Sequence, residues 1–148
     1  MQRIYLDACA VNRLFDDRIQ ARVRAEAEAI ESFYQLLLSR RIDWMTSEVR
    51  EAELLNNPNS LARKRTLELV SIATQRLVIS AASFLRADQL ERLGYGAFDA
   101  LHLAAAEQGN ADMLLTTDDR FFRQARRGLG RPTVRVENPI DWAKGIVP

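Results

Sequence analysis

The stretch IYLDACAVNRLFDD, residues 4–17, opens with an apolar, strand-forming run and places a carboxylate directly after it. The run Ile4–Leu6 is typical of a strand that enters a protein core. Asp7 follows at once, and burying a carboxylate is unfavourable unless hydrogen bonds or a cation compensate it. We therefore expect Asp7 to have a role beyond ending the strand.

Short apolar strands alternate with helices along the rest of the chain. Strands that alternate with helices form a mostly parallel sheet with both faces covered. We therefore expect an α/β fold with a central sheet of about five strands between two helical layers. The predicted strands lie near residues 3–6, 42–46, 77–80, 113–116 and 133–136, and the predicted helices near residues 10–15, 19–40, 48–55, 60–74, 83–93, 98–108 and 118–127.

The bulk composition is that of a globular domain. With 148 residues, 47% of them hydrophobic and 28% charged, we expect one domain spanning residues 1–148. No apolar run suits a signal peptide or a membrane span, and a single cysteine, Cys9, fits a reducing cytoplasm. The net charge of +1 neither favours nor excludes a nucleic-acid partner.

Carboxylates follow two of the predicted strands at the point where each strand ends. Asp7 follows the first strand, and Asp118 and Asp119 follow the fourth, in MLLTTDD at residues 113–119. Open parallel sheets bind their ligands beyond the carboxyl ends of the strands. Both strands thus direct acids to the edge where ligands bind, although Asp118 or Asp119 would also serve as a helix cap.

A third carboxylate lies in an apolar helix. Asp99 belongs to AFDALHLAAAE, residues 97–107, a segment that is apolar on nearly every face and is expected to be buried. An aspartate in the first turn either complements the helix N-terminus or faces a cation. The presence of Asp7 and Asp118 favours the cation.

The segment TSEVREAELLNN, residues 46–57, offers a fourth acid. Glu48, Glu51 and Glu53 share one predicted helix, but side chains two residues apart point about 200° apart, so the three do not share a face. Glu53 accompanies the apolar side, whereas Glu48 and Glu51 are expected to be solvated. Glu48 stays the alternative to Glu53 as the fourth acid.

Four carboxylates at one edge repel one another unless a cation lies among them. Mg²⁺ or Mn²⁺, hard ions with oxygen ligands, suit a site with few protein ligands. Such an ion lowers the pKa of a bound water and neutralises phosphate, which favours phosphodiester hydrolysis. We predict that Asp7, Asp99 and Asp118 bind the metal and that Glu53 binds metal or orients water.

Four polar residues near these acids have open roles. Asn12 orients Asp7 or touches substrate, with helix capping or a turn role as the alternative, and Thr116 and Asp119 are further candidates for support. His102 follows Asp99 by three residues, on a neighbouring helix position. We expect His102 to be a hydrogen-bonded structural histidine, with metal binding as the alternative.

A basic helix face follows the fourth strand. Arg120, Arg123 and Arg127 lie at helical spacing, with Arg126 and Arg131 nearby. Arginines at the rim of an acidic site would hold the phosphates of a nucleic-acid strand. A solvated basic face is the alternative.

Three other phosphate chemistries do not fit the sequence. A cysteine-dependent phosphatase loop, C-x5-R, needs an arginine where Phe15 stands. A haloacid-dehalogenase-like phosphatase needs an aspartate where Cys9 stands, and a receiver domain needs a lysine that neither Lys64 nor Lys144 supplies. The single histidine also disfavours nucleophilic catalysis that depends on a Ser-His pair or on two histidines.

The chain closely resembles the PIN-domain nucleases, and among them the VapC-like toxins of bacterial toxin–antitoxin modules. The resembling segments, in the family's order, are IYLDACAVNRLFDD, TSEVREAELLNNP, FDALHLAAAE and LLTTDDRFF, with ENPIDWA near the end. The resemblance implies a three-layer α/β/α PIN-like fold and an endoribonuclease that uses Mg²⁺ or Mn²⁺ to activate water for RNA cleavage. It also implies a homodimer and a small cognate antitoxin as partner.

The acids of the resembling family correspond to Asp7, Glu53, Asp99 and Asp118. One position departs from the family, because Ala8 stands where a Thr or Ser usually follows the first Asp. The missing hydroxyl would loosen the positioning of Asp7 or its waters. Ala8 therefore favours the alternative function, a non-catalytic PIN module that binds RNA or a protein partner.

Overall fold

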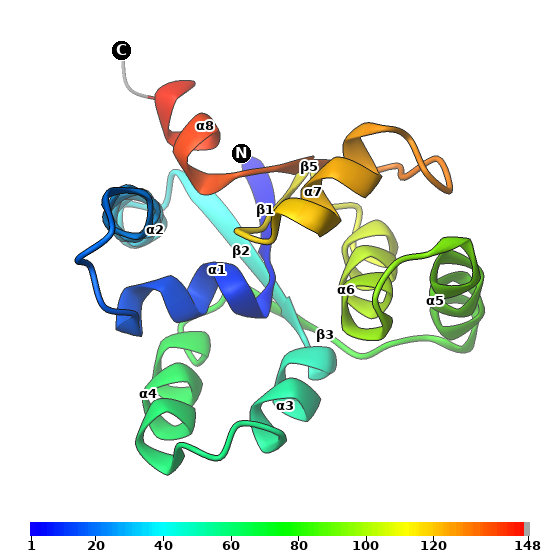
Figure 1. Cartoon of the computed structure of the whole chain (residues 1–148), viewed down its shortest axis with the longest axis horizontal. Coiled ribbons are helices and arrows are strands. Elements are labelled where there is room, and N and C mark those ends of the chain that lie inside the picture. Colours follow the sequence, from blue (N-terminus) through cyan, green and yellow to red (C-terminus); the bar gives the residue numbers. More distant parts are fainter. Residues whose placement is uncertain (147–148) are drawn as a thin grey trace.

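The computed structural model describes residues 1–146, which form five strands and eight α-helices (Figure 1). The strands are β1 (Gln2–Leu6), β2 (Ile42–Ser47), β3 (Gln75–Leu77), β4 (Met113–Leu115) and β5 (Arg135–Glu137). The helices are α1 (Ala8–Asn12), α2 (Ala21–Leu38), α3 (Glu48–Leu55), α4 (Ser60–Val70), α5 (Ala81–Leu93), α6 (Ala97–Gln108), α7 (Asp119–Arg126) and α8 (Pro139–Lys144), and a 3₁₀ turn, η1 (Arg13–Phe15), follows α1.

The sheet is parallel throughout, with the strand order β3-β2-β1-β4-β5. β1 lies in the middle, where Ile4 pairs with Trp44 of β2 on one side and with Met113 of β4 on the other. The chain leaves β1 toward β2 and later continues on the opposite side with β4. The strand order therefore changes direction at the carboxyl end of β1, which is where open α/β sheets bind ligands.

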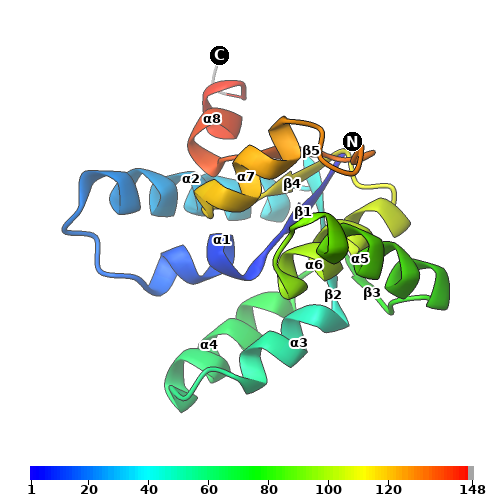
Figure 2. The same cartoon turned by 45° about the vertical axis from the view of Figure 1, so that its right-hand side comes forward.

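Helices cover both faces of the sheet, which confirms the predicted three-layer α/β/α architecture. Successive residues of a strand point to opposite faces, so Ile4 and Tyr5 belong to different cores. Side chains of α1, α2 and α8 pack in the core that contains Ile4, and side chains of α5, α6 and α7 pack in the core that contains Tyr5. Figure 2 shows α2 and α8 on one side of β1 and β2, with α5 and α6 on the other.

The third and fifth strands begin at residues other than those predicted. β3 covers Gln75–Leu77 rather than 77–80, and β5 covers Arg135–Glu137 rather than 133–136. Both are three-residue strands at the edges of the sheet. Their bounds are set by pairing with β2 and β4, which their own apolar pattern does not reveal.

The longest helix, α2, has 18 residues and buries Ile30 and Phe33 on its inner side. Its remaining surface carries charged side chains such as Glu28 and Glu31, which are exposed. No helix within residues 1–146 combines the length and the apolar character needed to cross a membrane.

Candidate functional site

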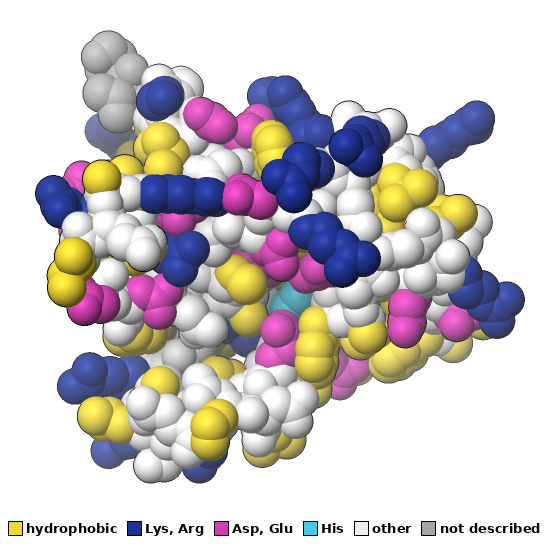
Figure 3. Space-filling model, in the orientation of Figure 1, with side chains coloured by type: hydrophobic (Ala, Val, Ile, Leu, Met, Phe, Trp, Pro, Cys, Tyr) yellow, Lys and Arg dark blue, Asp and Glu magenta, His cyan; other side chains and the backbone are white. Residues whose placement is uncertain are grey.

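Four elements bring carboxylates to the carboxyl edge of the sheet. Asp7 follows β1, Asp118 follows β4, Asp99 lies in the first turn of α6, and Glu53 lies on α3. The charges of Asp7, Asp118 and Glu53 all raise the pKa of Asp99, so the four groups lie within electrostatic reach of one another. Figure 3 shows acidic side chains gathered in the middle of this face, with Lys and Arg side chains beside them over α7. The structure therefore brings together the four acids that the sequence singles out.

Asp7 is buried and held in place by hydrogen bonds. Its side chain is the N-cap of α1, where Oδ1 accepts from the backbone N of Ala10 at 2.9 Å. Burial raises the pKa of Asp7, and the hydrogen bond from Thr116 is among the interactions that lower it. Asp7 thus has a fixed orientation in a setting that disfavours its charge.

Asp118 caps α7 and also faces the other acids. Its Oδ1 accepts from the backbone N of Arg120 at 2.9 Å and of Phe121 at 3.1 Å. The backbone N of Asp118 donates to Thr116 Oγ1 at 3.0 Å, so the hydroxyl of Thr116 contacts both acidic positions that follow the strands. Only Oδ1 is used as a cap, so capping leaves Oδ2 available to a ligand.

Asp99 carries the most informative carboxylate of the four. It is half-buried, and its side chain makes no hydrogen bond to any other residue in the described range. Burial, followed by the charges of Asp7, Asp118 and Glu53, raises its pKa to about 7, and only the charge of Arg120 lowers it. Because the side chain does not cap its helix, the helix-capping alternative for Asp99 loses its support.

Glu53 is tied to the histidine of the chain. His102 Nε2 is hydrogen-bonded to Glu53 Oε1, and His102 Nδ1 is 2.6 Å from the hydroxyl of Tyr5. The hydroxyl of Tyr5 is also 2.6 Å from Ser47 Oγ. His102 is therefore a buried, hydrogen-bonded histidine, as predicted, and it orients a carboxylate of the site.

Glu48 has a structural role instead of the predicted solvated position. It is half-buried, and its Oε1 accepts from the backbone N of Ile79 at 2.9 Å, just beyond β3. Glu51 is exposed and pairs with Arg76 at 2.6 Å. Because Glu48 is engaged at the end of β3, the geometry favours Glu53 as the fourth acid.

Arg50 is a feature that the sequence reasoning missed. Its side chain is 1% exposed, and its three guanidinium nitrogens have no hydrogen-bond partner in the described part of the chain. Burial lowers its pKa, whereas the charges of Asp7 and Glu53 raise it. One turn of helix separates Arg50 from Glu53, and this spacing was a signal that both occupy one face.

The remaining supporting candidates differ in position. Asp119 is exposed and forms a two-point pair with Arg22, with contacts of 2.6 and 2.7 Å, so its carboxylate is directed to α2. Asn12 ends α1, and its side chain forms no hydrogen bond within the described residues. Thr116 is the member of this group that the structure places against the acids.

The predicted basic face of α7 is exposed. Arg120, Arg123 and Arg127 form no ion pair within residues 1–146. Arg126 differs from them, because it lies over the ring of Phe122 and 3.7 Å from Glu137. Arg120 and Arg123 on α7 and Arg127 just after it are thus open to solvent, and Arg120 lies within electrostatic reach of Asp99.

The donor set at this edge fits a hard divalent cation. As the side chains stand, no three His, Cys, Asp or Glu residues between Met1 and Ile146 are arranged to hold a metal ion. Four carboxylates nevertheless share this edge with the thiol of Cys9, and burial together with the mutual repulsion of the acids raises the pKa of Asp99. A divalent cation among oxygen ligands relieves such repulsion. Asp7, Asp99 and Asp118 therefore have the chemistry that Mg²⁺ or Mn²⁺ requires.

This chain matches one family of known proteins and is similar in fold to solved structures. The family model for the PIN domain matches residues 4–127. Among solved structures, FitAcB from Neisseria gonorrhoeae is similar with a TM-score of 0.59 and 17% identity, over 92% of this chain and 97% of that chain. VapBC2 from Rickettsia felis, bound to a DNA fragment from their promoter, is similar with a TM-score of 0.58 and 16% identity, over 91% of this chain and 98% of that chain. No curated protein matches the chain.

Proposed function

Because this chain belongs to the PIN domain family, whose members are nucleases, we propose that it is an endoribonuclease that depends on Mg²⁺ or Mn²⁺ and hydrolyses RNA phosphodiester bonds. The observation that carries this proposal is Asp99. It is a half-buried carboxylate without a hydrogen bond in the described chain, and three other acids raise its pKa. A cation beside a group in this setting favours its charged form.

The proposed roles follow from how each carboxylate is held. Asp7, Asp99 and Asp118 would bind the ion, and Glu53 would bind it or orient the water that attacks the phosphate. When bound, the ion supplies a lowered pKa for that water and charge neutralisation for the phosphate. Hydrogen bonds fix Asp7 and Asp118 in advance, and His102 fixes Glu53. This preorganisation reduces the rearrangement needed at the moment of reaction.

RNA phosphates would be held by the basic face of α7. Arg120, Arg123 and Arg127 are exposed beside an acidic site that would otherwise repel the strand. Contacts of this kind position a strand without reading its sequence. Asp119, paired with Arg22, would support the arrangement by fixing the start of α7 against α2.

The biological setting we propose is that of a toxin controlled by a small antitoxin protein. The sequence resembles VapC-like toxins in four segments, and the fold is similar to that of a chain in VapBC2. We further propose a homodimer in the cytoplasm, where the free thiol of Cys9 would stay reduced. Light scattering of the purified chain alone tests the homodimer. The same measurement with the product of an adjacent small reading frame tests the antitoxin.

A non-catalytic PIN module is the second candidate, favoured by Ala8. The structure offers Asp7 another hydroxyl, because the side chain of Thr116 lies close enough to lower the pKa of this carboxylate. The backbone N of Ala10 adds a hydrogen bond. The positioning that a residue-8 hydroxyl would provide is thus supplied from β4 and α1, which supports the catalytic function.

Cleavage of a labelled RNA in Mg²⁺ or Mn²⁺ tests the proposal. We expect cleavage that EDTA stops, that added metal restores, and that Asp7→Asn or Asp99→Asn lowers by at least about 100-fold. Asp88→Asn is the matched control, since it makes the same change at an exposed position on α5. Cleavage that persists in EDTA or in both variants would contradict the metal mechanism. RNA binding without cleavage under all conditions would favour the non-catalytic module.

A further inference from the structure

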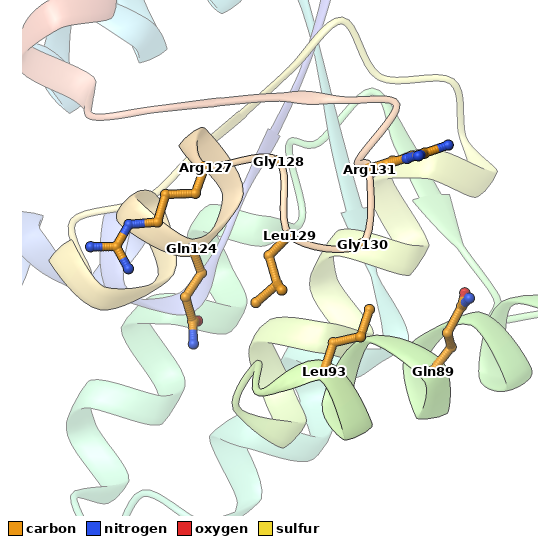
Figure 4. Close-up of a pocket in the computed structure, with 8 residues that line it drawn as sticks. All are labelled: Gln89, Leu93, Gln124, Arg127, Gly128, Leu129, Gly130 and Arg131. Carbon is orange, nitrogen blue, oxygen red and sulfur yellow. The ribbon is translucent and has the colours of Figure 1, made fainter.

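A second recess lies between α5 and the loop that joins α7 to β5, with a volume of about 530 Å³. Leu129 extends into it from the loop and Leu93 from α5 on the opposite side, and Gln124 enters from α7 (Figure 4). Arg127 and Arg131 extend to either side of this apolar centre (Figure 4). The recess therefore combines an apolar floor, an amide edge and two flanking cations.

The loop that forms one wall is held from several directions. Arg86 Nη2 donates to the carbonyl of Gly130 at 2.7 Å, and the hydroxyl of Tyr95 donates to the carbonyl of Leu129 at 2.8 Å. Gly130 has φ +73°, and a Cβ there would lie 2.7 Å from Leu90 Cδ2. The loop thus packs against α5 as only glycine allows, and its shape is set before any ligand binds.

Arg131 holds an unfavourable backbone conformation at the rim. Its φ is +52°, in the left-handed region, which costs a non-glycine residue about 1 kcal/mol. Glycine would adopt this conformation without strain. Strained residues of this kind concentrate at binding sites, and here the strain accompanies a positive charge beside the recess.

Helix α7 connects this recess to the acidic cluster. Asp118 caps its first turn and Arg127 is the residue at its other end. Eight helical residues span about 12 Å, a distance that a few nucleotides of a single strand bridge. Arg120 and Arg123 are exposed along the way, so the path between the two places is basic.

Gln124 forms part of the wall of the recess. Its Nε2 donates to the carbonyl of Gly94 at 2.9 Å, which fixes the amide. Its Oε1 is turned into the protein, where it is buried. The side chain is therefore held in place before any ligand binds.

We propose that the recess binds one nucleobase of a single-stranded RNA whose scissile phosphate lies at the acidic cluster, an inference that rests on the proposed function. The base lies on Leu93 and Leu129, beside the wall that Gln124 forms. Arg127 and Arg131 contact the flanking phosphates. Single strands present bases that are free to leave the stack and enter such a recess.

A scan with abasic nucleotides tests this directly. The protein carries Asp99→Asn so that RNA stays intact, and a fluorescent ten-nucleotide RNA has one base removed at each position in turn. We expect one position, a few nucleotides from the cleavage site of the active protein, to weaken binding at least fivefold when its base is removed. In Leu93→Glu, removal of that base should no longer weaken binding, whereas in Leu93→Met it should weaken binding as before. Leu93 is 45% exposed, so both substitutions are compatible with folding.

Substitutions of Arg131 provide an independent test. Arg131→Gly removes the charge and relieves the backbone, so we expect equal or higher thermal stability together with at least threefold weaker RNA binding. Arg131→Lys should retain most of the affinity, and Arg65→Ala, a charge loss on exposed α4, should leave it unchanged.

The outcomes separate this inference from the proposed function. RNA that is cleaved but shows no position-specific abasic effect, or shows the same effect in Leu93→Glu, would overturn the nucleobase site alone. Wild-type protein that neither cleaves nor binds RNA would overturn the proposed function and this inference with it. If Leu93→Glu weakens binding of an acidic peptide but not of RNA, the recess serves a protein partner and the inference is wrong.

Discussion

Glu53 and His102 are hydrogen-bonded to each other between α3 and α6, although 49 residues separate them in the chain. The other ring nitrogen of His102 is hydrogen-bonded to the hydroxyl of Tyr5, which is also hydrogen-bonded to the hydroxyl of Ser47 at the end of β2. A carboxylate at the edge of the sheet is therefore oriented by a line of polar side chains that begins in the core. The position of Glu53 depends on this line as much as on its own helix.

Substitution of His102 should reduce activity through Glu53. His102→Phe fills the same space but removes both hydrogen bonds, and loss of a partner that orients a site carboxylate lowers activity about 10- to 100-fold. His102→Gln keeps one donor and should lose less. The measurement is kcat/KM for RNA cleavage, with circular dichroism to verify folding. Full activity in a folded His102→Phe variant would contradict the orienting role.

The sequence predicts the acids at this edge but not the side chains that support them. Asp7 and Asp118 follow apolar strands, a local pattern that parallel strands convert into proximity. The roles of Arg50 and Glu48 depend on which side chains α2, β1 and β3 bring against α3, and no local period encodes that.

Edge strands show the same limit of local patterns. The bounds of β3 were missed because three residues carry too little periodicity to fix a register. Long or strongly patterned elements such as α6 were predicted almost to the residue. What the sequence lacks at β3 is the pairing partner, β2, and only the fold supplies it.

Thr116 should matter for both acids that follow the strands. Thr116→Val has nearly the same shape but loses the hydrogen bond to Asp7 and the one from the backbone N of Asp118. We expect about 1 to 2 kcal/mol lower stability, the usual effect of leaving buried polar groups unpaired, and a further rise in the pKa of Asp7. Urea denaturation measures the change in stability. Mn²⁺ titration calorimetry measures the weaker metal binding that a raised pKa of Asp7 would cause. Thr116→Ser should restore both, and a Ser variant no better than Val would contradict the hydroxyl's role.

Arg50 should weaken cation binding at the site. A buried positive charge behind Asp7 and Glu53 repels a divalent ion more strongly than an exposed charge does. We expect Arg50→Met to bind Mn²⁺ about tenfold more tightly than wild type, and Arg50→Lys, which keeps the charge, to stay within about twofold. Equal Mn²⁺ affinity in the Met and Lys variants would show that the charge of Arg50 does not reach the ion.

Asp99 should make the metal-free protein less stable as pH rises. Its pKa in the folded chain is about 7 against an ordinary value of 3.8, so between these values the folded state holds a proton that the unfolded state has lost. Stability from this group is therefore fully present below about pH 4 and declines as pH rises toward 7. The upper limit of the decline is about 4 kcal/mol, and the partial exposure of Asp99 reduces it.

Urea denaturation in EDTA between pH 4 and 8, for wild type and Asp99→Asn, isolates this contribution. Asparagine cannot titrate, so the variant lacks this loss of stability. The free energy of unfolding of wild type should therefore fall relative to that of the variant as pH rises from about 4 to 7, and the difference should level off above pH 7. Carboxylates that are not coupled to Asp99, such as Glu51 and Asp119 with their lowered pKa values, titrate equally in both proteins and cancel. The difference thus reports Asp99 together with its repulsion by Asp7, Asp118 and Glu53. Mg²⁺ should reverse the shift by stabilising wild type at pH 8 and not the variant, because a bound cation favours the charged form of Asp99. A difference that stays constant with pH would mean that Asp99 is ionised in the folded chain without help, and its repulsion by Asp7 and Asp118 would then not be the reason for binding a cation.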